Sequence, residues 1–269
     1  MTIRILTWNI LSGGFTKYGS DETRPPRLPA LADVIRRLEP DVACLIDTYR
    51  WADMFSPNDL QQLFNFPFAY TAKLDDERLK ILGHDNGITV LSHIPSTSAH
   101  TIRIATRNAL AVRTPGLDIF PTYLDDTSED TRKAQLTVLL REVHKNIPTV
   151  ITGDFNTFDK SDLAKTSEAL EKMRQAYPTA QAKMEHSLNE MKRGEVTRML
   201  TNAGFIDQGK GRGNTMPAGL FPLKLATPIA RIDYTFGNKS VKLKNFQVLT
   251  GEPYANLSDH YPILTTIAV

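Results

Sequence analysis

Short apolar runs alternate along the chain with stretches of helical periodicity, a pattern typical of folds that combine sheets with helices. The opening run at residues 3–8 predicts a strand. Apolar residues within 31–38 then repeat at helical spacing until Pro40 ends the helix, and the uninterrupted apolar run at 42–46 predicts a buried strand. The chain therefore opens with a strand, a helix and a strand.

Further strands follow at intervals of about ten residues, a spacing typical of antiparallel sheets. They are predicted at residues 87–91, 101–104, 109–112 and 117–120. We expect these four strands to form one β-meander. An amphipathic helix is predicted at 128–145 and a strand at 149–152. Three closing strands are predicted at 232–236, 241–249 and 263–267.

The segment 159–200 differs in composition from the rest of the chain. It is rich in Lys, Glu, Ala, Gln and Met and poor in β-branched residues, which favours helix, and Pro178 divides it into two expected helices. Glycines and prolines at 209–228 predict an extended loop. We expect a single domain over residues 1–269 with 159–200 as a helical insertion.

Strands at both ends of the chain with helices among them indicate an α+β fold. We expect a four-layered α/β/β/α sandwich, in which two packed, mostly antiparallel sheets are flanked by helices. With 41% hydrophobic and 23% charged residues, the composition is that of a globular protein with a large core. The same figures exclude a mainly disordered chain.

Charge and targeting features narrow the class of protein only slightly. The net charge of +2 neither indicates nor excludes a nucleic-acid partner. No run approaches about eighteen uncharged apolar residues, and the start lacks the apolar stretch of a signal peptide, so we expect neither a membrane span nor export. The single Cys44 lies in an apolar run and predicts a small buried packing residue. A cytoplasmic location fits these features.

Polar clusters lie where the predicted strands begin or end. They are Trp8-Asn9, Asp47, Gly153-Asp154-Phe155-Asn156 and Ser258-Asp259-His260. Because a sheet can gather strand ends from distant parts of a chain, we expect these clusters to converge at one rim. Taken singly, each has a plain structural explanation, since short polar side chains commonly cap helices, bridge loops or form turns.

In this order, the clusters resemble the endonuclease/exonuclease/phosphatase superfamily, the metal-dependent phosphoesterases related to exonuclease III, DNase I, sphingomyelinases and inositol phosphatases. The match spans nearly the whole chain and also includes Gly87–Ser92 and Arg231-Ile232-Asp233-Tyr234. One tetrapeptide is weak evidence, but the joint occurrence of these motifs in the family's order is specific. The resemblance implies a DNase I-like fold and hydrolysis of a phosphodiester or phosphomonoester by in-line attack of water.

The resemblance also implies a site for Mg²⁺ or Mn²⁺ at Asp47, Asn9 and Asp259. Carboxylate and amide oxygens are hard donors that suit these ions. In the family, the residue at the position of Asp47 is usually Glu and is the main metal ligand. Aspartate is one methylene shorter, and Mg²⁺ requires ligand distances near ~2.1 Å. We therefore expect weaker or altered metal binding.

Catalytic roles follow from the same resemblance. Asp154 would orient or deprotonate the attacking water, and Asn156 would donate a hydrogen bond to a phosphoryl oxygen. His260 would act as the general acid/base or bind the phosphate. Asp233 matches the carboxylate that fixes the tautomer of this imidazole.

A second departure from the family is Tyr123. Many relatives have Thr-His-Leu where this chain has Thr122-Tyr123-Leu124. A phenol donates one hydrogen bond but is neutral near pH 7, so it would stabilise phosphate charge less than an imidazolium does. We expect Tyr123 to contact the phosphate, and an ordinary sheet tyrosine is the alternative.

Three functions stay open at this point. The first is a Mg²⁺- or Mn²⁺-dependent phosphoesterase acting on a small molecule, a lipid headgroup or nucleic acid. The second is a DNA endonuclease or exonuclease of the same fold, against which the flat charge distribution speaks. The third is a binding protein that has lost turnover, suggested by Asp47 and Tyr123. No protein partner is evident, and Asn86 is predicted to turn the chain before Gly87 rather than to enter the site.

Overall fold

The computed structural model describes residues 1–74, 86–144, 146–163, 171, 181–221 and 228–269. The strands of the first sheet are β1 (Thr2–Asn9), β2 (Val42–Ile46), β3 (Phe68–Ala72), β4 (Ile88–Ser92), β11 (Lys242–Val248) and β12 (Ile263–Ala268). Those of the second sheet are β5 (Ser98–Ile104), β6 (Arg107–Thr114), β7 (Leu117–Tyr123), β8 (Thr149–Asp154), β9 (Phe205–Asp207) and β10 (Asp233–Asn238). The spatial orders are β11-β12-β1-β2-β4-β3 and β5-β6-β7-β8-β10-β9.

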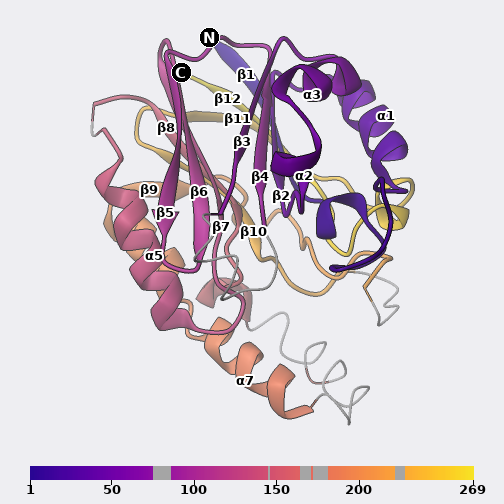
Figure 1. Ribbon diagram of the computed structural model, residues 1–269. Coiled ribbons are helices and arrows are strands. Elements are labelled where there is room, and N and C mark those ends of the chain that lie inside the picture. The colour runs from indigo at the N-terminus through magenta and orange to yellow at the C-terminus, as the bar shows by residue number, and fades with distance from the viewer. Residues whose placement is uncertain (75–85, 145, 164–170, 172–180, 222–227) are drawn as a thin grey trace.

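Helices cover the outer faces of both sheets, which pack against each other (Figure 1). They are α1 (Leu28–Leu38), α2 (Trp51–Met54), α3 (Pro57–Phe64), α5 (Glu129–Arg141), α7 (Gln181–Lys192) and α8 (Glu195–Asn202), with 3-10 turns η1 (Ser12–Gly14) and η3 (Tyr254–Asn256). This arrangement confirms the expected four-layered sandwich. Within the described residues, no helix is long and apolar enough to cross a lipid bilayer.

Three buried clusters fill the spaces between the four layers. Trp8 and Leu45 pack with Leu31 and Phe64 between the first sheet and its helices. The layer between the sheets is formed by side chains such as Ile5, Cys44, Val112, Ile119 and Val150. The third cluster joins the second sheet to α5 and α8 through residues such as Phe120, Leu136, Phe155, Leu200 and Phe236. The prediction that Cys44 is a buried packing residue is confirmed.

Strand pairing brings the polar clusters to one edge. β1 and β2 are parallel with Asn9 opposite Ile46, and β7 and β8 are parallel with Tyr123 opposite Asp154. β10 is antiparallel to β8, so its first residue, Asp233, also lies opposite Asp154. β12 is antiparallel to β1 and therefore begins at the edge where β1 ends. This edge carries side chains from both sheets.

The predicted β-meander is wrong in one strand. β5, β6 and β7 pair as expected, but β4 belongs to the first sheet, between β2 and β3. The chain crosses from one sheet to the other between Ser92 and Ser98, where Pro95 interrupts regular pairing.

The helix predicted at 128–145 ends at Arg141, so that prediction is too long. Arg113 on β6 contacts the residues that follow the helix. Its guanidinium donates to the Glu142 carbonyl at 3.0 Å and contacts His144 Nδ1 at 2.7 Å, which ties these residues to the sheet. Much of the helix expected before Pro178 lies outside the described residues.

Several short elements were not predicted, namely α2, α3, β3 and β9. A local signal for α3 was available, because Ser56 and Asp59 form a capping box around Pro57 at the first helical position. Eight residues are too few for periodicity alone to reveal the helix.

Candidate active site

Asn9 and Asp47 lie at the ends of the neighbouring strands β1 and β2 and are 3% and 2% exposed. Asn9 Nδ2 donates a hydrogen bond to Asp154 Oδ2 at 3.0 Å, and Asn9 Oδ1 accepts one from the Leu11 amide at 3.0 Å. The Asn9–Asp154 bond crosses from the first sheet to the second. The site is therefore built across the interface of the two sheets.

The Asp47 carboxylate is held by three donors. Oδ2 accepts from the Ser12 amide at 2.7 Å and from the Tyr18 hydroxyl, and Oδ1 accepts from Asn86 Nδ2 at 3.3 Å. The prediction that Asn86 only turns the chain is wrong, because its buried amide lies against Asp47 and also donates to the Tyr18 hydroxyl at 3.0 Å. Burial raises the pKa of Asp47, and the hydrogen bonds from Tyr18 and Ser12 oppose that shift. Sequence reasoning did not find Ser12 or Tyr18.

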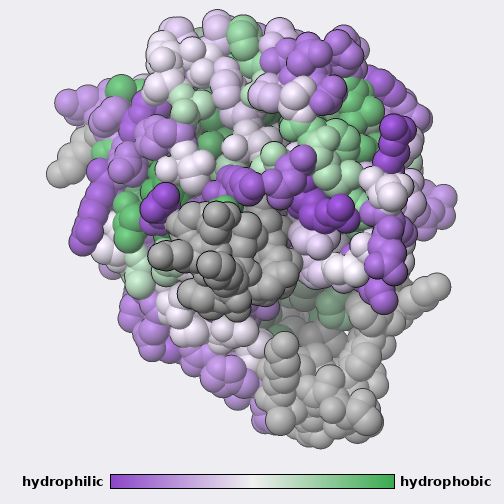
Figure 2. All heavy atoms as spheres, in the orientation of Figure 1, coloured by the Kyte–Doolittle hydropathy of each residue, from purple (hydrophilic) through white to green (hydrophobic). Residues whose placement is uncertain are grey.

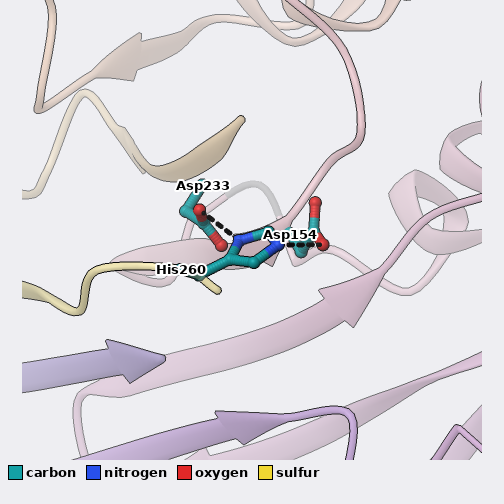
Figure 3. A group of neighbouring side chains, drawn as sticks. All are labelled: Asp154, Asp233 and His260. Carbon is teal, nitrogen blue, oxygen red and sulfur yellow. Dashed lines mark hydrogen bonds and ion pairs between the residues drawn. The ribbon is translucent and has the colours of Figure 1, made fainter. Parts of the chain in front are cut away.

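Asp154, Asp233 and His260 form a compact buried group (Figure 3). His260 Nδ1 lies 2.9 Å from Asp233 Oδ2, and His260 Nε2 lies 3.9 Å from Asp154 Oδ2. The indole of Trp8 donates to the His260 carbonyl at 2.9 Å, which fixes the backbone of the histidine against β1. With Nδ1 engaged by Asp233, Nε2 is the nitrogen turned toward Asp154.

Electrostatics in this group favour a positively charged imidazole. Burial alone lowers the pKa of His260, but Asp233, Asp259 and Asp154 outweigh it and raise the pKa to about 10. Burial raises the pKa of Asp154 to about 7, opposed by the charge of His260 and assisted by that of Asp233. Asp259 lies at the rim, with its side chain 20% exposed and Oδ1 4.0 Å from His260 Nε2. These shifts favour a proton on His260 near neutral pH.

The turn after β8 depends on Gly153 and Asn156. Gly153 has φ +143°, and a Cβ there would lie 1.9 Å from the Thr122 carbonyl oxygen, so no larger residue fits. Asn156 adopts the left-handed region at φ +47°, which asparagine tolerates better than most residues. Its backbone N–H donates a hydrogen bond to Asp154 Oδ1 at 2.9 Å. This backbone shape turns Asp154 toward the site.

Tyr123 lies beside a buried cation that sequence reasoning missed. The guanidinium carbon of Arg107 is 4.4 Å from the centre of the Tyr123 ring. Arg107 Nη2 is 2.9 Å from Asp126 Oδ1. Burial raises the pKa of Tyr123 well above its ordinary value, and Asp47 adds to the shift, so the phenol is neutral. Arg107 is 7% exposed, yet in the sequence it looks like any charged residue at the start of a strand.

The donor set suits a hard divalent cation. One group of three potential ligands in the described part of the chain, Asp154, Asp233 and His260, has its ligand atoms within 4.8 Å of one another. Asn9, whose Nδ2 contacts Asp154 Oδ2, and Asp47 lie at the ends of the neighbouring strands β1 and β2 and add an amide and a carboxylate. Asp233 Oδ1 is buried without a hydrogen-bond partner among the described residues. The carboxylate and amide oxygens of this set suit a hard divalent cation, and the protonated His260 is left to hold a proton or bind an anion.

Comparison with protein families gives a match that covers almost the entire chain. The model of the endonuclease/exonuclease/phosphatase family matches residues 6–260. The chain belongs to this family. Members of the endonuclease/exonuclease/phosphatase family are hydrolases that generally use divalent metals, so membership indicates a phosphoesterase or a nuclease. A search of curated proteins found no match.

Solved structures share the fold of this family member at low sequence identity. An AP endonuclease from Archaeoglobus fulgidus is 14% identical, with a TM-score of 0.71 over 99% of this chain and 100% of the other. The 3′ phosphatase NExo from Neisseria, bound to a product DNA hairpin, is 16% identical, with a TM-score of 0.67 over 98% of each chain. A family protein from Beutenbergia cavernae is 21% identical, with a TM-score of 0.67 over 100% of this chain and 72% of the other.

Proposed function

We propose that this protein hydrolyses a phosphate ester with the aid of Mg²⁺ or Mn²⁺. One observation carries the proposal. Asp154 Oδ2 lies 3.0 Å from Asn9 Nδ2 and 3.9 Å from His260 Nε2, while Asp233 holds the opposite nitrogen of the imidazole at 2.9 Å. A carboxylate placed between a neutral donor and a fixed imidazole is suited to orienting water and moving its proton.

Asp47, Asn9 and Asp259 would hold the cation, which when bound neutralises charge on the phosphate. The oxygen atoms of Asp47 are fixed by the donors around them, so this carboxylate is preorganised. Preorganisation matters here because aspartate is one methylene shorter than the glutamate usual in the family. The shorter side chain can move less to bring its oxygen within bonding distance of a cation.

The remaining side chains activate the attacking water and bind the phosphate. Asp154 orients and deprotonates the attacking water, and His260 holds a proton at Nε2 toward the phosphoryl group or the leaving oxygen. Asn156 and Tyr123 donate hydrogen bonds to phosphoryl oxygens. Arg107 adds a buried positive charge behind Tyr123.

A nucleic-acid ester is the second candidate substrate. It is favoured by the similarity of fold to an AP endonuclease and to a 3′ phosphatase bound to DNA. Hydrophilic and apolar side chains are interspersed on the face in view in Figure 2. The net charge of +2 adds no support for a nucleic-acid substrate. We therefore propose a small phosphate ester as the first substrate class and nucleic acid as the second.

A panel of phosphate esters tests the proposal. Bis(p-nitrophenyl) phosphate, p-nitrophenyl phosphate, a phosphodiester lipid headgroup and single-stranded, duplex and abasic DNA are incubated with Mg²⁺ or Mn²⁺ and with EDTA. We expect turnover of at least one ester and its loss in EDTA. The DNA members distinguish the nuclease from the small-molecule enzyme. Turnover that persists in EDTA would exclude metal dependence, and no turnover at all would favour a binding protein.

A further inference from the structure

Asn156 is held at Asp154 Oδ1 through its backbone amide and at the loop after β7 through its side chain. The side-chain amide donates one hydrogen bond, to the Leu124 carbonyl at 3.0 Å, and the residue sits at φ +47° directly after β8. Thr157 follows, and its side chain is fully buried. The place of Asn156 therefore depends on what fixes Leu124 on one side and Thr157 on the other.

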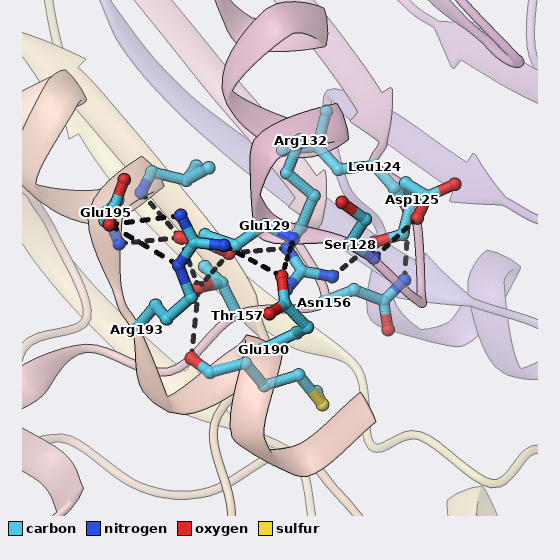
Figure 4. A network of polar contacts seen from close by, with 12 residues as sticks. Leu124, Asp125, Ser128, Glu129, Arg132, Asn156, Thr157, Glu190, Arg193 and Glu195 are labelled. Carbon is cyan, nitrogen blue, oxygen red and sulfur yellow. Dashed lines mark hydrogen bonds and ion pairs between the residues drawn. The ribbon is translucent and has the colours of Figure 1, made fainter. Parts of the chain in front are cut away.

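A buried ion pair lies under this turn (Figure 4). Glu129 begins α5, Arg132 is one turn later, and both side chains are 0% exposed, with Arg132 Nε 2.6 Å from Glu129 Oε2. Glu129 Oε1 also accepts from the amides of Glu195 and Val196, at 2.6 and 2.9 Å, at the start of α8. Because a buried carboxylate is unfavourable without such partners, this network holds one geometry.

The ion pair reaches both neighbours of Asn156. The Thr157 hydroxyl donates to the Glu129 carboxylate, at 3.2 Å from Oε1 and 3.1 Å from Oε2. Arg132 Nη1 donates at 2.8 Å to the carbonyl of Asp125, the residue after Leu124. The Glu129–Arg132 pair thus fixes Thr157, which follows Asn156. It also fixes the Asp125 carbonyl, next to Leu124, whose carbonyl accepts the hydrogen bond from the Asn156 side chain.

We propose that Glu129 and Arg132 are positioning residues for Asn156, acting through the Thr157 hydroxyl and the Asp125 carbonyl. The proposal rests on the proposed function, in which Asn156 donates to the phosphate. A displacement of about 1 Å at such a donor can lower a rate about 10²-fold. The pair is therefore part of the site's alignment, in addition to joining α5 and α8.

Thr157→Val tests the link, since it removes the hydroxyl and keeps the shape. We expect kcat on the most active ester of the panel to fall about tenfold or more with KM little changed. Thr157→Ser, which keeps the hydroxyl, should restore most of kcat. Thr114→Val is the matched control, because Thr114 is also a buried threonine whose hydroxyl donates a hydrogen bond, in its case to the Leu117 carbonyl at the far end of β6. Arg132→Lys, which cannot span Glu129 and the Asp125 carbonyl together, should act like Thr157→Val.

A double-mutant cycle separates positioning from simple stability. In an Asn156→Ala background, Thr157→Val should cause no further loss of kcat, because the group that it positions is gone. An undiminished further loss, or a wild-type kcat for Thr157→Val alone, would overturn the proposal.

A readout that needs no turnover keeps the two proposals separate. If the wild-type protein cleaves no ester, the proposed function fails, and positioning is judged from the Asn156 side-chain amide resonances in ¹⁵N–¹H spectra. Arg132→Lys, which is distant from Asn156 in the sequence, should shift these resonances and Thr114→Val should leave them in place. Unchanged resonances in Arg132→Lys would reject the positioning role whatever the activity.

Discussion

Asp154→Asn should lower kcat by about 10³-fold, within the range that loss of a general base produces. The substitution keeps the size of the side chain and an oxygen for the Asn9 amide, but removes the group that can take a proton from water. Both carboxylate oxygens accept hydrogen bonds, from Asn9 Nδ2 and from the Asn156 backbone amide, so the new NH2 group faces one of these donors and stability should fall by about 1–3 kcal/mol. Steady-state kinetics and a thermal unfolding curve measure the two effects.

Asp118→Asn is the matched control for this prediction. Asp118 is 2% exposed and pairs with Arg113 at 2.6 Å, at the opposite end of β7 from Tyr123. Its replacement weakens a buried charged hydrogen bond and should reduce stability by about 1.5–3 kcal/mol with kcat nearly unchanged. If Asp154→Asn retained wild-type kcat, Asp154 would not be the group that activates water.

Asp47→Asn should weaken Mn²⁺ binding by at least about 100-fold, a loss larger than that expected for a group that only supports a metal ligand. The amide preserves the shape around Ser12 and Tyr18 and removes the negative charge that attracts the cation. Isothermal titration with Mn²⁺ measures the affinity, and hydrolysis at saturating substrate should fall in parallel.

Asp118→Asn again provides a control, since it removes a buried carboxylate away from the site and should bind Mn²⁺ like the wild type. Equal Mn²⁺ affinity in the wild type and in Asp47→Asn would mean that the cation binds elsewhere. The group of Asp154, Asp233 and His260 would then be the alternative location.

Strand-end motifs were the part of the site that the sequence could predict. Asn9, Asp154 and Asp233 each end or begin a strand. Strand pairing brings Asp154 and Asp233 together in the second sheet, and the packing of the two sheets brings Asn9 to them. His260 precedes β12, which is antiparallel to β1, so it reaches the same edge. These positions could be predicted because an apolar run in the sequence indicates a buried strand. A polar residue at the end of such a run is then expected at the edge of the sheet.

The groups that hold Asp47 could not be predicted in the same way. Tyr18 and Asn86 reach it from positions 29 and 39 residues away, and neither lies in a periodic segment. Arg107 begins a strand, and a single charge there carries no sign that it will be buried. Loop paths and burial depend on how the two sheets pack, and short-range patterns do not encode that packing.

The central claim, that side chains from both sheets surround one divalent cation at Asp47, is tested most directly by anomalous diffraction from crystals soaked in Mn²⁺. We expect one strong peak at about 2.1 Å from an oxygen of Asp47, on the side that faces Asp154 and His260. A peak bound by Asp154, Asp233 and His260 and out of reach of Asp47 would contradict it.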